Sequence, residues 1–257
     1  MTIENGGKTA LVTGASSGIG EAICRLLVKH DYRVVATARS LDRLEALESE
    51  LGRNLRALAL DINDKAAVSK LAAMLPAGFD QIDILINNAG HDTGGRRRFD
   101  EGSAGQWCDI IETNVQGMIR MTHVLVGGML QRGRGHIINL GSIAGLKPYA
   151  SGSAYVASKY AVHGLSETLR LDYAGKGIRV TEIMPGLVRS GFAGQRLGDA
   201  AEAQAFYDSF DACLRPEDVA ETVCFAIAQP DHVEIAQLVV LPVAAMPQPD
   251  QSYRNSA

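Results

Sequence analysis

Seven short apolar runs alternate with longer helical patterns along almost the whole chain of 257 residues. Most of the runs are rich in Val, Ile and Leu without polar alternation, which is typical of strands buried on both faces of a parallel sheet. We expect strands at residues 9–13, 33–37, 56–60, 82–86, 136–140, 179–183 and 237–241. We expect helices at residues 18–30, 41–51, 65–75, 105–131, 153–176 and 216–229. This order predicts an α/β fold, a doubly wound parallel sheet of about seven strands with helices on both faces.

No internal repeat and no low-complexity linker divides the chain, which predicts a single domain over residues 1–257. Two segments interrupt the alternation, a Gly- and Arg-rich one at 90–105 and a long polar one at 187–212. Both follow expected strands, and ligands of open α/β sheets bind beyond the carboxyl ends of the strands. We therefore expect substrate loops at about 90–105 and 187–212, and a loose tail at about 247–257.

The composition excludes several classes of protein. Hydrophobic residues make up 46% and charged residues 21%, which is ordinary for a soluble globular protein. A net charge of −4 without a polybasic segment argues against a nucleic-acid partner. We expect neither a targeting segment nor a membrane span, because no apolar stretch is long enough. The four cysteines form no metal-ligand spacing with the six histidines, which predicts free thiols, no metal and a cytoplasmic location.

Tyr155 and Lys159 lie four residues apart on an expected helix, and Ser142 precedes the tyrosine by thirteen residues. Residues i and i+4 share one helix face, so a phenol and an ammonium would stand side by side. A fixed cation lowers the pKa of a phenol and makes it a better acid or base at neutral pH. The pair also fits an ordinary surface helix, so its weight depends on the rest of the chain.

A glycine-rich turn joins the first expected strand to the first expected helix, with the sequence Thr13-Gly14-Ala15-Ser16-Ser17-Gly18-Ile19-Gly20. Gly14 permits a tight turn, Gly18 lets the backbone approach a pyrophosphate, and Gly20 allows close helix packing. The helix N-terminus attracts negative charge. A glycine turn can be purely structural, but its place between strand and helix favours dinucleotide binding and a Rossmann-type sheet.

Together these motifs resemble those of the short-chain dehydrogenase/reductase family, in order and over nearly the whole chain. The resemblance rests on Thr13-Gly14-x-x-x-Gly18-x-Gly20, Asn87-Asn88-Ala89-Gly90, Asn114, Ser142, Tyr155-x-x-x-Lys159 and Pro185-Gly186. It implies an oxidoreductase that transfers a hydride between a nicotinamide cofactor and an alcohol or carbonyl. It also implies a homo-oligomer, often a tetramer.

The resemblance assigns roles to four catalytic residues. Tyr155 would be the general acid/base, Ser142 would hydrogen-bond the substrate oxygen, and Lys159 would lower the tyrosine pKa and hold the nicotinamide ribose. Asn114 would sit in a distorted helix turn and hold a water that links Lys159 to solvent. The cofactor contacts would be Gly14, Ser16, Ser17, Gly18, Ile19, Gly20, Arg39, Asp61, Asn88, Ala89, Gly90, Tyr155, Lys159, Pro185, Gly186, Val188 and Ser190.

Arg39 predicts a preference for NADP(H). Ala38 ends the second expected strand where NAD-binding relatives place an acidic residue for the ribose 2′-hydroxyl, and Arg39 follows it. A guanidinium would grip a 2′-phosphate that a carboxylate would repel. Ser16 is a second candidate contact for this phosphate, and the alternative is that Arg39 is a solvated loop charge.

Within the family, framework segments such as Leu75-Pro76-Ala77 and Pro216-Glu217-Asp218-Val219 are similar to those of bacterial serine and 3-hydroxy acid dehydrogenases and sulfoacetaldehyde reductases. The chain departs from that group in the segment 90–105 and at Lys147, which replaces an aromatic residue. These differences leave open a 3-ketoacyl or broad carbonyl reductase, and more remotely a non-enzymatic cofactor sensor. An epimerase or dehydratase of the extended branch would have a different glycine spacing.

Cations in the expected substrate loops indicate a small substrate with an anionic group. The candidates are Lys147, five residues after Ser142, the run of arginines at 96–98, and Arg189 after Pro185-Gly186. A buried carboxylate or sulfonate needs a charge-assisted partner, and a bidentate guanidinium is a common one. Three adjacent arginines cannot all point inward, so part of this charge is expected to face solvent.

Overall fold

The computed structural model describes residues 7–210 and 212–244, and the seven strands in them form one parallel sheet. The strand order is β3-β2-β1-β4-β5-β6-β7, so the chain winds outward from β1 in one direction and from β4 in the other. This order confirms the predicted doubly wound sheet. The strands are β1 (Thr9–Thr13), β2 (Arg33–Ala38), β3 (Leu55–Ala59), β4 (Ile84–Asn87), β5 (Gly135–Leu140), β6 (Ile178–Pro185) and β7 (Gln237–Val240).

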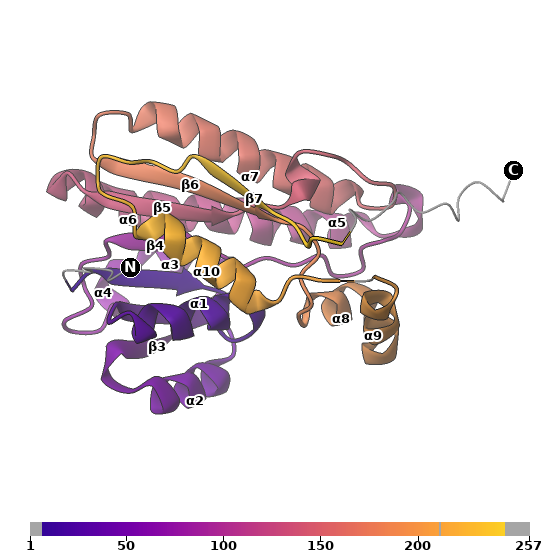
Figure 1. Ribbon diagram of the computed structural model, residues 1–257, viewed down its shortest axis with the longest axis horizontal. Coiled ribbons are helices and arrows are strands. Elements are labelled where there is room, and N and C mark those ends of the chain that lie inside the picture. The colour runs from indigo at the N-terminus through magenta and orange to yellow at the C-terminus, as the bar shows by residue number, and fades with distance from the viewer. Residues whose placement is uncertain (1–6, 211, 245–257) are drawn as a thin grey trace, which may run out of the picture.

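Helices cover both faces of the sheet (Figure 1). One layer contains α1 (Gly18–Lys29), α2 (Leu41–Leu51) and α10 (Pro216–Ile227). The other contains α3 (Lys65–Ser69), α4 (Leu71–Met74), α6 (Met118–Arg132) and α7 (Ser153–Asp172), with α5 (Ala104–Ile111) packed on α7. Each central strand is therefore covered by apolar helix side chains on both faces of the sheet. This burial on both faces explains the unbroken Val, Ile and Leu runs in the sequence.

Successive residues of each central strand belong to different cores. In β1, Ala10 and Val12 pack in the core under α1 and α10, whereas Leu11 packs in the core on the other face. In β4, Ile84 and Leu85 divide in the same way. Burying one such aliphatic side chain contributes roughly 1.5–3 kcal/mol, so each face of the sheet is held by its own set of contacts.

Two predicted helices are interrupted in the structure. The helix predicted at 65–75 breaks at Lys70 into α3 and α4. The helix predicted at 105–131 divides into α5, a π-helix at Glu112–Gly117 and α6. A π-helix widens the turn and re-aims its side chains, which is a common device at functional sites.

The segment 187–212 is not the long loop that we predicted. It contains α8 (Phe192–Leu197) and α9 (Ala200–Asp208), which stand apart from the two helical layers at one end of the sheet (Figure 1). Gly198 ends α8 in the left-handed conformation at φ 77°, and the Asp199 side chain accepts a hydrogen bond from the Glu202 N–H at the start of α9. A terminal glycine followed by a capping aspartate is a recognisable helix boundary.

The other predicted loop, 90–105, contains a short 3₁₀ helix at Phe99–Glu101 before α5. Within residues 7–210 and 212–244, no helix is long and apolar enough to cross a membrane. The same residues contain no group of three or more His, Cys, Asp or Glu that could hold a metal ion. The tail predicted at 247–257 lies outside the described residues.

Gly20 lies where α1 crosses the end of β1. A Cβ atom at this position would stand 2.3 Å from the Gly14 carbonyl oxygen and 2.5 Å from Asn88 Nδ2. That amide nitrogen donates hydrogen bonds to the carbonyl oxygens of Thr13 and Gly14, at 2.9 and 3.2 Å. A side chain on Gly20 would therefore push apart the helix, the glycine turn and the segment after β4.

We expect Gly20→Ala to lower the free energy of unfolding by about 1–3 kcal/mol, because the methyl group overpacks a contact with backbone. Gly164→Ala is the matched control, since Gly164 lies in α7 and a methyl group added there would have nothing within 4 Å. It should raise the free energy of unfolding by about 0.5–1 kcal/mol. Urea denaturation measures both, and equal effects of the two substitutions would contradict the packing argument.

Candidate active site

A cleft of about 2000 Å³ lies beyond the carboxyl ends of the strands, where the strand order reverses between β1 and β4. Its walls come from the segments that follow β1, β2, β3, β4, β5 and β6, together with α8 and α9. This is the place that open α/β sheets use for ligands. All the cofactor residues predicted from the sequence line it except Gly20, which packs behind the turn.

The glycine turn forms the floor of one end of the cleft. Gly14 and Gly18 have φ angles of 65° and 57°, in the left-handed region that glycine enters without strain. A Cβ on Gly14 would stand 2.8 Å from the Ala89 Cα, so the turn also needs glycine for space. Ser17 precedes α1 without a side-chain cap, which leaves the N–H groups of the first helical turn available to a phosphate. The cradle fits the pyrophosphate of a dinucleotide.

Two arginines stand at the rim of this end. Arg39 follows β2 as predicted, and Arg43 lies in the first turn of α2, four residues later. Both are exposed side chains that line the cleft, and neither forms a hydrogen bond or ion pair with another described residue. We did not predict Arg43, although its i, i+4 spacing from Arg39 was visible in the sequence.

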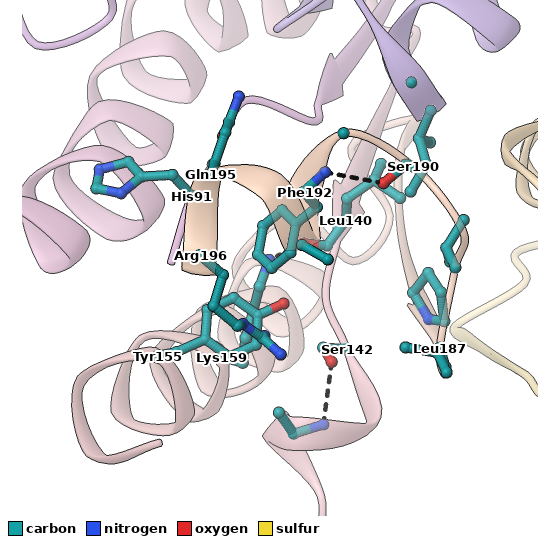
Figure 2. A pocket seen from close by; sticks show the side chains of 18 of the residues that line it. His91, Leu140, Ser142, Tyr155, Lys159, Leu187, Ser190, Phe192, Gln195 and Arg196 are labelled. Carbon is teal, nitrogen blue, oxygen red and sulfur yellow. Dashed lines mark hydrogen bonds between the residues drawn. The ribbon is translucent and has the colours of Figure 1, made fainter. Parts of the chain in front are cut away.

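Tyr155, Lys159 and Ser142 meet deeper in the cleft (Figure 2). Tyr155 and Lys159 project from the same face of α7, with the lysine Nζ 5.6 Å from the centre of the tyrosine ring. Ser142 lies beside the Tyr155 phenol and lowers its pKa, and the Ser142 hydroxyl caps a 3₁₀ helix (Ile143–Gly145) by accepting from the Ala144 N–H at 3.1 Å. The ammonium of Lys159 donates to the Leu140 carbonyl at 2.7 Å. The predicted juxtaposition of the three side chains is therefore present.

Burial dominates the ionisation of this group. It raises the pKa of Tyr155 above its usual range, and it lowers the pKa of Lys159 to about 8. We predicted that Lys159 would be the cation that lowers the tyrosine pKa, but the main cation opposing the effect of burial is Arg196. With the phenol protonated at neutral pH, Tyr155 is a hydrogen-bond and proton donor towards an oxygen in the cleft.

Asn114 lies in the π-helix, which is the distorted turn that the resemblance implies. Its Oδ1 accepts from the His91 N–H at 2.9 Å, and its Nδ2 donates to the His91 carbonyl at 3.0 Å and to the Ser158 hydroxyl at 3.0 Å. The side chain is 3% exposed and does not line the cleft. Asn114 therefore joins the segment after β4 to the helix that carries Tyr155 and Lys159.

The cations predicted to contact a substrate lie in different surroundings. Lys147 is an exposed side chain at the rim of the cleft, and Arg96 lines it with its guanidinium 4.9 Å from the centre of the Phe206 ring. Arg189 does not line the cleft and pairs with Asp208 at 3.0 Å on the surface.

Besides Arg43, a second cation in the cleft was absent from our sequence-based candidates. Arg196 projects from α8 towards Tyr155 and Lys159, as Figure 2 shows. Its Nε lies 2.6 Å from Oδ2 of Asp92, on the segment after β4. Because we took 187–212 for a loop, nothing in the residue spacing pointed to this arginine.

A family model described as short chain dehydrogenase matches residues 8–200. The chain belongs to this family. The NADP-dependent 3-hydroxy acid dehydrogenase YdfG of Escherichia coli is 43% identical, over 91% of this chain and 94% of that protein. The serine 3-dehydrogenase of Agrobacterium fabrum is 38% identical, over 96% of this chain and 99% of that protein.

Solved structures give the same family assignment. The closed form of a serine dehydrogenase complexed with NADP⁺ superposes with a TM-score of 0.89 at 42% identity, covering 91% of this chain and 95% of that one. A metagenomic short-chain oxidoreductase in complex with NADP gives a TM-score of 0.77 at 31% identity, over 92% and 98% of the two chains. The predicted homotetramer and cytoplasmic location stay predictions.

The lowered pKa of Lys159 predicts a pH-dependent stability. An unfolded lysine titrates near pH 10.4 and the folded one near 8, so between these values the unfolded state binds more protons. Stability contributed through this residue therefore rises with pH across that window. From pH 7 to pH 10 we expect wild type to gain about 1–3 kcal/mol in free energy of unfolding relative to Lys159→Met.

Chemical denaturation at a series of pH values measures this difference. Other groups, including Tyr155 and Cys24, titrate in both proteins, so their contributions largely cancel when the two curves are subtracted. A difference that stays constant from pH 7 to pH 10 would show that the ammonium is not desolvated in the fold.

Proposed function

We propose that this protein is an NADP-dependent oxidoreductase that transfers a hydride between NADP(H) and the alcohol or carbonyl group of a small hydroxy acid. The observation that carries the proposal is the convergence of Ser142, Tyr155 and Lys159 in the same cleft as the glycine turn. The relatives named 3-hydroxy acid and serine 3-dehydrogenases support the cofactor and the substrate class.

The cofactor, when bound, supplies or accepts the hydride, and the chain supplies position and a proton. The Tyr155 phenol exchanges a proton with the substrate oxygen, because it is the protonated acid in the cleft. The Ser142 hydroxyl, which lies beside that phenol, holds the same oxygen and polarises it. Both groups are fixed by secondary structure, Tyr155 by α7 and Ser142 by its capping bond to Ala144, so little reorganisation is needed.

Lys159 places a positive charge one turn along α7 from the phenol. Its bond to the Leu140 carbonyl fixes the ammonium at the end of β5, and this charge favours the phenolate that forms when Tyr155 gives up its proton. Asn114 holds the backbone of His91 and the hydroxyl of Ser158, next to Lys159. We assign Asn114 the role of positioning this part of α7 against the segment after β4.

A 3-ketoacyl or broad carbonyl reductase is the second candidate. The observation that favours it is the size of the cleft, about 2000 Å³, and the aromatic side chains Phe192, Phe206 and Phe210 on its α8 and α9 side. Turnover of free hydroxy acids compared with thioesters and bulky ketones separates the two candidates. Preference for the bulky substrates would favour the reductase.

Tyr155→Phe should lower kcat by roughly 10²-fold or more while NADP(H) still binds, because the change removes the proton donor and leaves the ring in place. Steady-state kinetics and a cofactor titration by fluorescence measure the two effects. Tyr173→Phe, at the end of the same helix, is the control and should keep wild-type kinetics. Near-normal turnover by Tyr155→Phe would exclude the proposed mechanism.

Arg39→Ala should reduce the preference for NADP over NAD by about 10-fold or more, since a charge-assisted hydrogen bond to the 2′-phosphate is worth roughly 1.5–3 kcal/mol. Arg43→Ala should act in the same direction, and kcat/KM with NAD should change little in either variant. Arg53→Ala, beyond the far end of α2, is the control. An unchanged cofactor ratio in the Arg39 and Arg43 variants, or a wild-type preference for NAD, would contradict the assignment.

A further inference from the structure

A buried ion pair closes the substrate side of the cleft. Asp92, two residues after Gly90, is 1% exposed, and Arg196 of α8 is 11% exposed. Their Oδ2 and Nε atoms are 2.6 Å apart. Removing two charges from water is costly unless the geometry is good and the remaining polar atoms are used, so this pair calls for an explanation beyond stability.

The two partners have different access to the cleft. Arg196 lines it, whereas Asp92 does not. The carboxylate contacts the guanidinium through Nε and does not engage the opposite edge of the guanidinium. The two terminal nitrogens on that edge, Nη1 and Nη2, have no hydrogen-bond partner in the part of the chain that the structure describes. A guanidinium in this state presents two parallel donors, the arrangement that fits a carboxylate bidentately.

Two aromatic rings contact the guanidinium of Arg196 and help to fix its position in the cleft. Its central carbon lies 5.6 Å from the centre of the Tyr155 ring and 5.2 Å from that of the Phe192 ring. An anionic group bound there would stand beside the phenol that faces the reacting oxygen (Figure 2). In a 3-hydroxy acid only two bonds separate the carbinol carbon from the carboxylate carbon, so both groups of one small molecule can be bound together.

Other cations near the cleft are less suited to this role. Lys147 is exposed at the rim, where solvent screens its charge. Arg189 lies outside the cleft and is paired with Asp208. Arg196 combines burial, a fixed orientation and an unused donor edge, and buried charge pairs discriminate between ligands much more strongly than exposed ones.

We propose that Arg196, positioned by Asp92, binds the anionic group of the substrate and makes the enzyme select hydroxy acids over uncharged alcohols. The proposal rests on the proposed function, because it assigns the substrate class of that same site. Asp92 is a positioning residue that acts through the arginine and does not touch the substrate.

The test compares 3-hydroxypropanoate with its methyl ester, which has the same alcohol and no charge. Arg196→Gln should lower kcat/KM for the acid about 10- to 100-fold more than for the ester, because the ester loses only the effect of Arg196 on the pKa of Tyr155, which both substrates share. Arg25→Gln, which removes an arginine that pairs with Glu21 and Glu50 and does not line the cleft, is the matched control and should leave the ratio unchanged.

Variants of Asp92 test whether this residue orients the Arg196 guanidinium or only holds α8 in place. Asp92→Ala frees Nε and should raise KM for the acid more than for the ester. Asp92→Asn keeps an oxygen that can accept from Nε, so it should restore much of the acid preference. If Arg196→Gln does not fold, Arg196→Lys is the alternative, because lysine keeps the charge but lacks the two parallel N–H donors of the guanidinium. It should weaken the acid preference without abolishing it.

Each contrary result has a distinct meaning. Equal losses on acid and ester in the Arg196 variants would overturn the proposal, because the arginine would then only hold α8 in place. Loss of acid preference in Lys147→Gln but not in Arg196→Gln would overturn it as well. A wild-type enzyme that turns over the ester and not the acid would instead refute the proposed function.

Discussion

The hydrogen bonds that tie the end of β1 to the end of β4 are the constraint on which the site depends. The Thr13 hydroxyl donates to the Ile86 carbonyl and accepts from the N–H groups of Asn88 and Ala89, at 3.0 Å each. The side-chain amide of Asn88 in turn donates hydrogen bonds to the carbonyl oxygens of Thr13 and Gly14. These bonds fix the position of the glycine turn relative to the segment after β4. That segment includes His91, the hydrogen-bond partner of Asn114, and both it and the glycine turn line the cleft.

Regular secondary structure accounts for what the sequence could predict. Strands that are buried on both faces can be recognised as continuous apolar runs. The i, i+4 spacing places Tyr155 and Lys159 on one helix face, whatever packs around the helix. The glycine turn is equally local, because the steric demands at Gly14 and Gly18 are set by the turn itself. The seven strands, the glycine turn and the pairing of Tyr155 with Lys159 could therefore be predicted from residue order.

The substrate side depends on contacts between distant segments, and there the sequence was insufficient. Arg196 and Asp92 are 104 positions apart, and only the packing of α8 beside the segment after β4 brings them together. The ionisation of Tyr155 is a similar case. The i, i+4 spacing correctly placed a cation near the phenol, but the larger effect is burial, which depends on everything packed around α7.

Helices α8 and α9 have a small core of their own, formed by Ala193, Ala203 and Tyr207. This cluster is separate from the two cores that hold the sheet. Substitutions in the substrate wall therefore alter few of the contacts on which the free energy of folding depends. This division lets the substrate change during evolution through substitutions in α8 and α9. The sheet, the glycine turn and their contribution to stability can meanwhile stay the same.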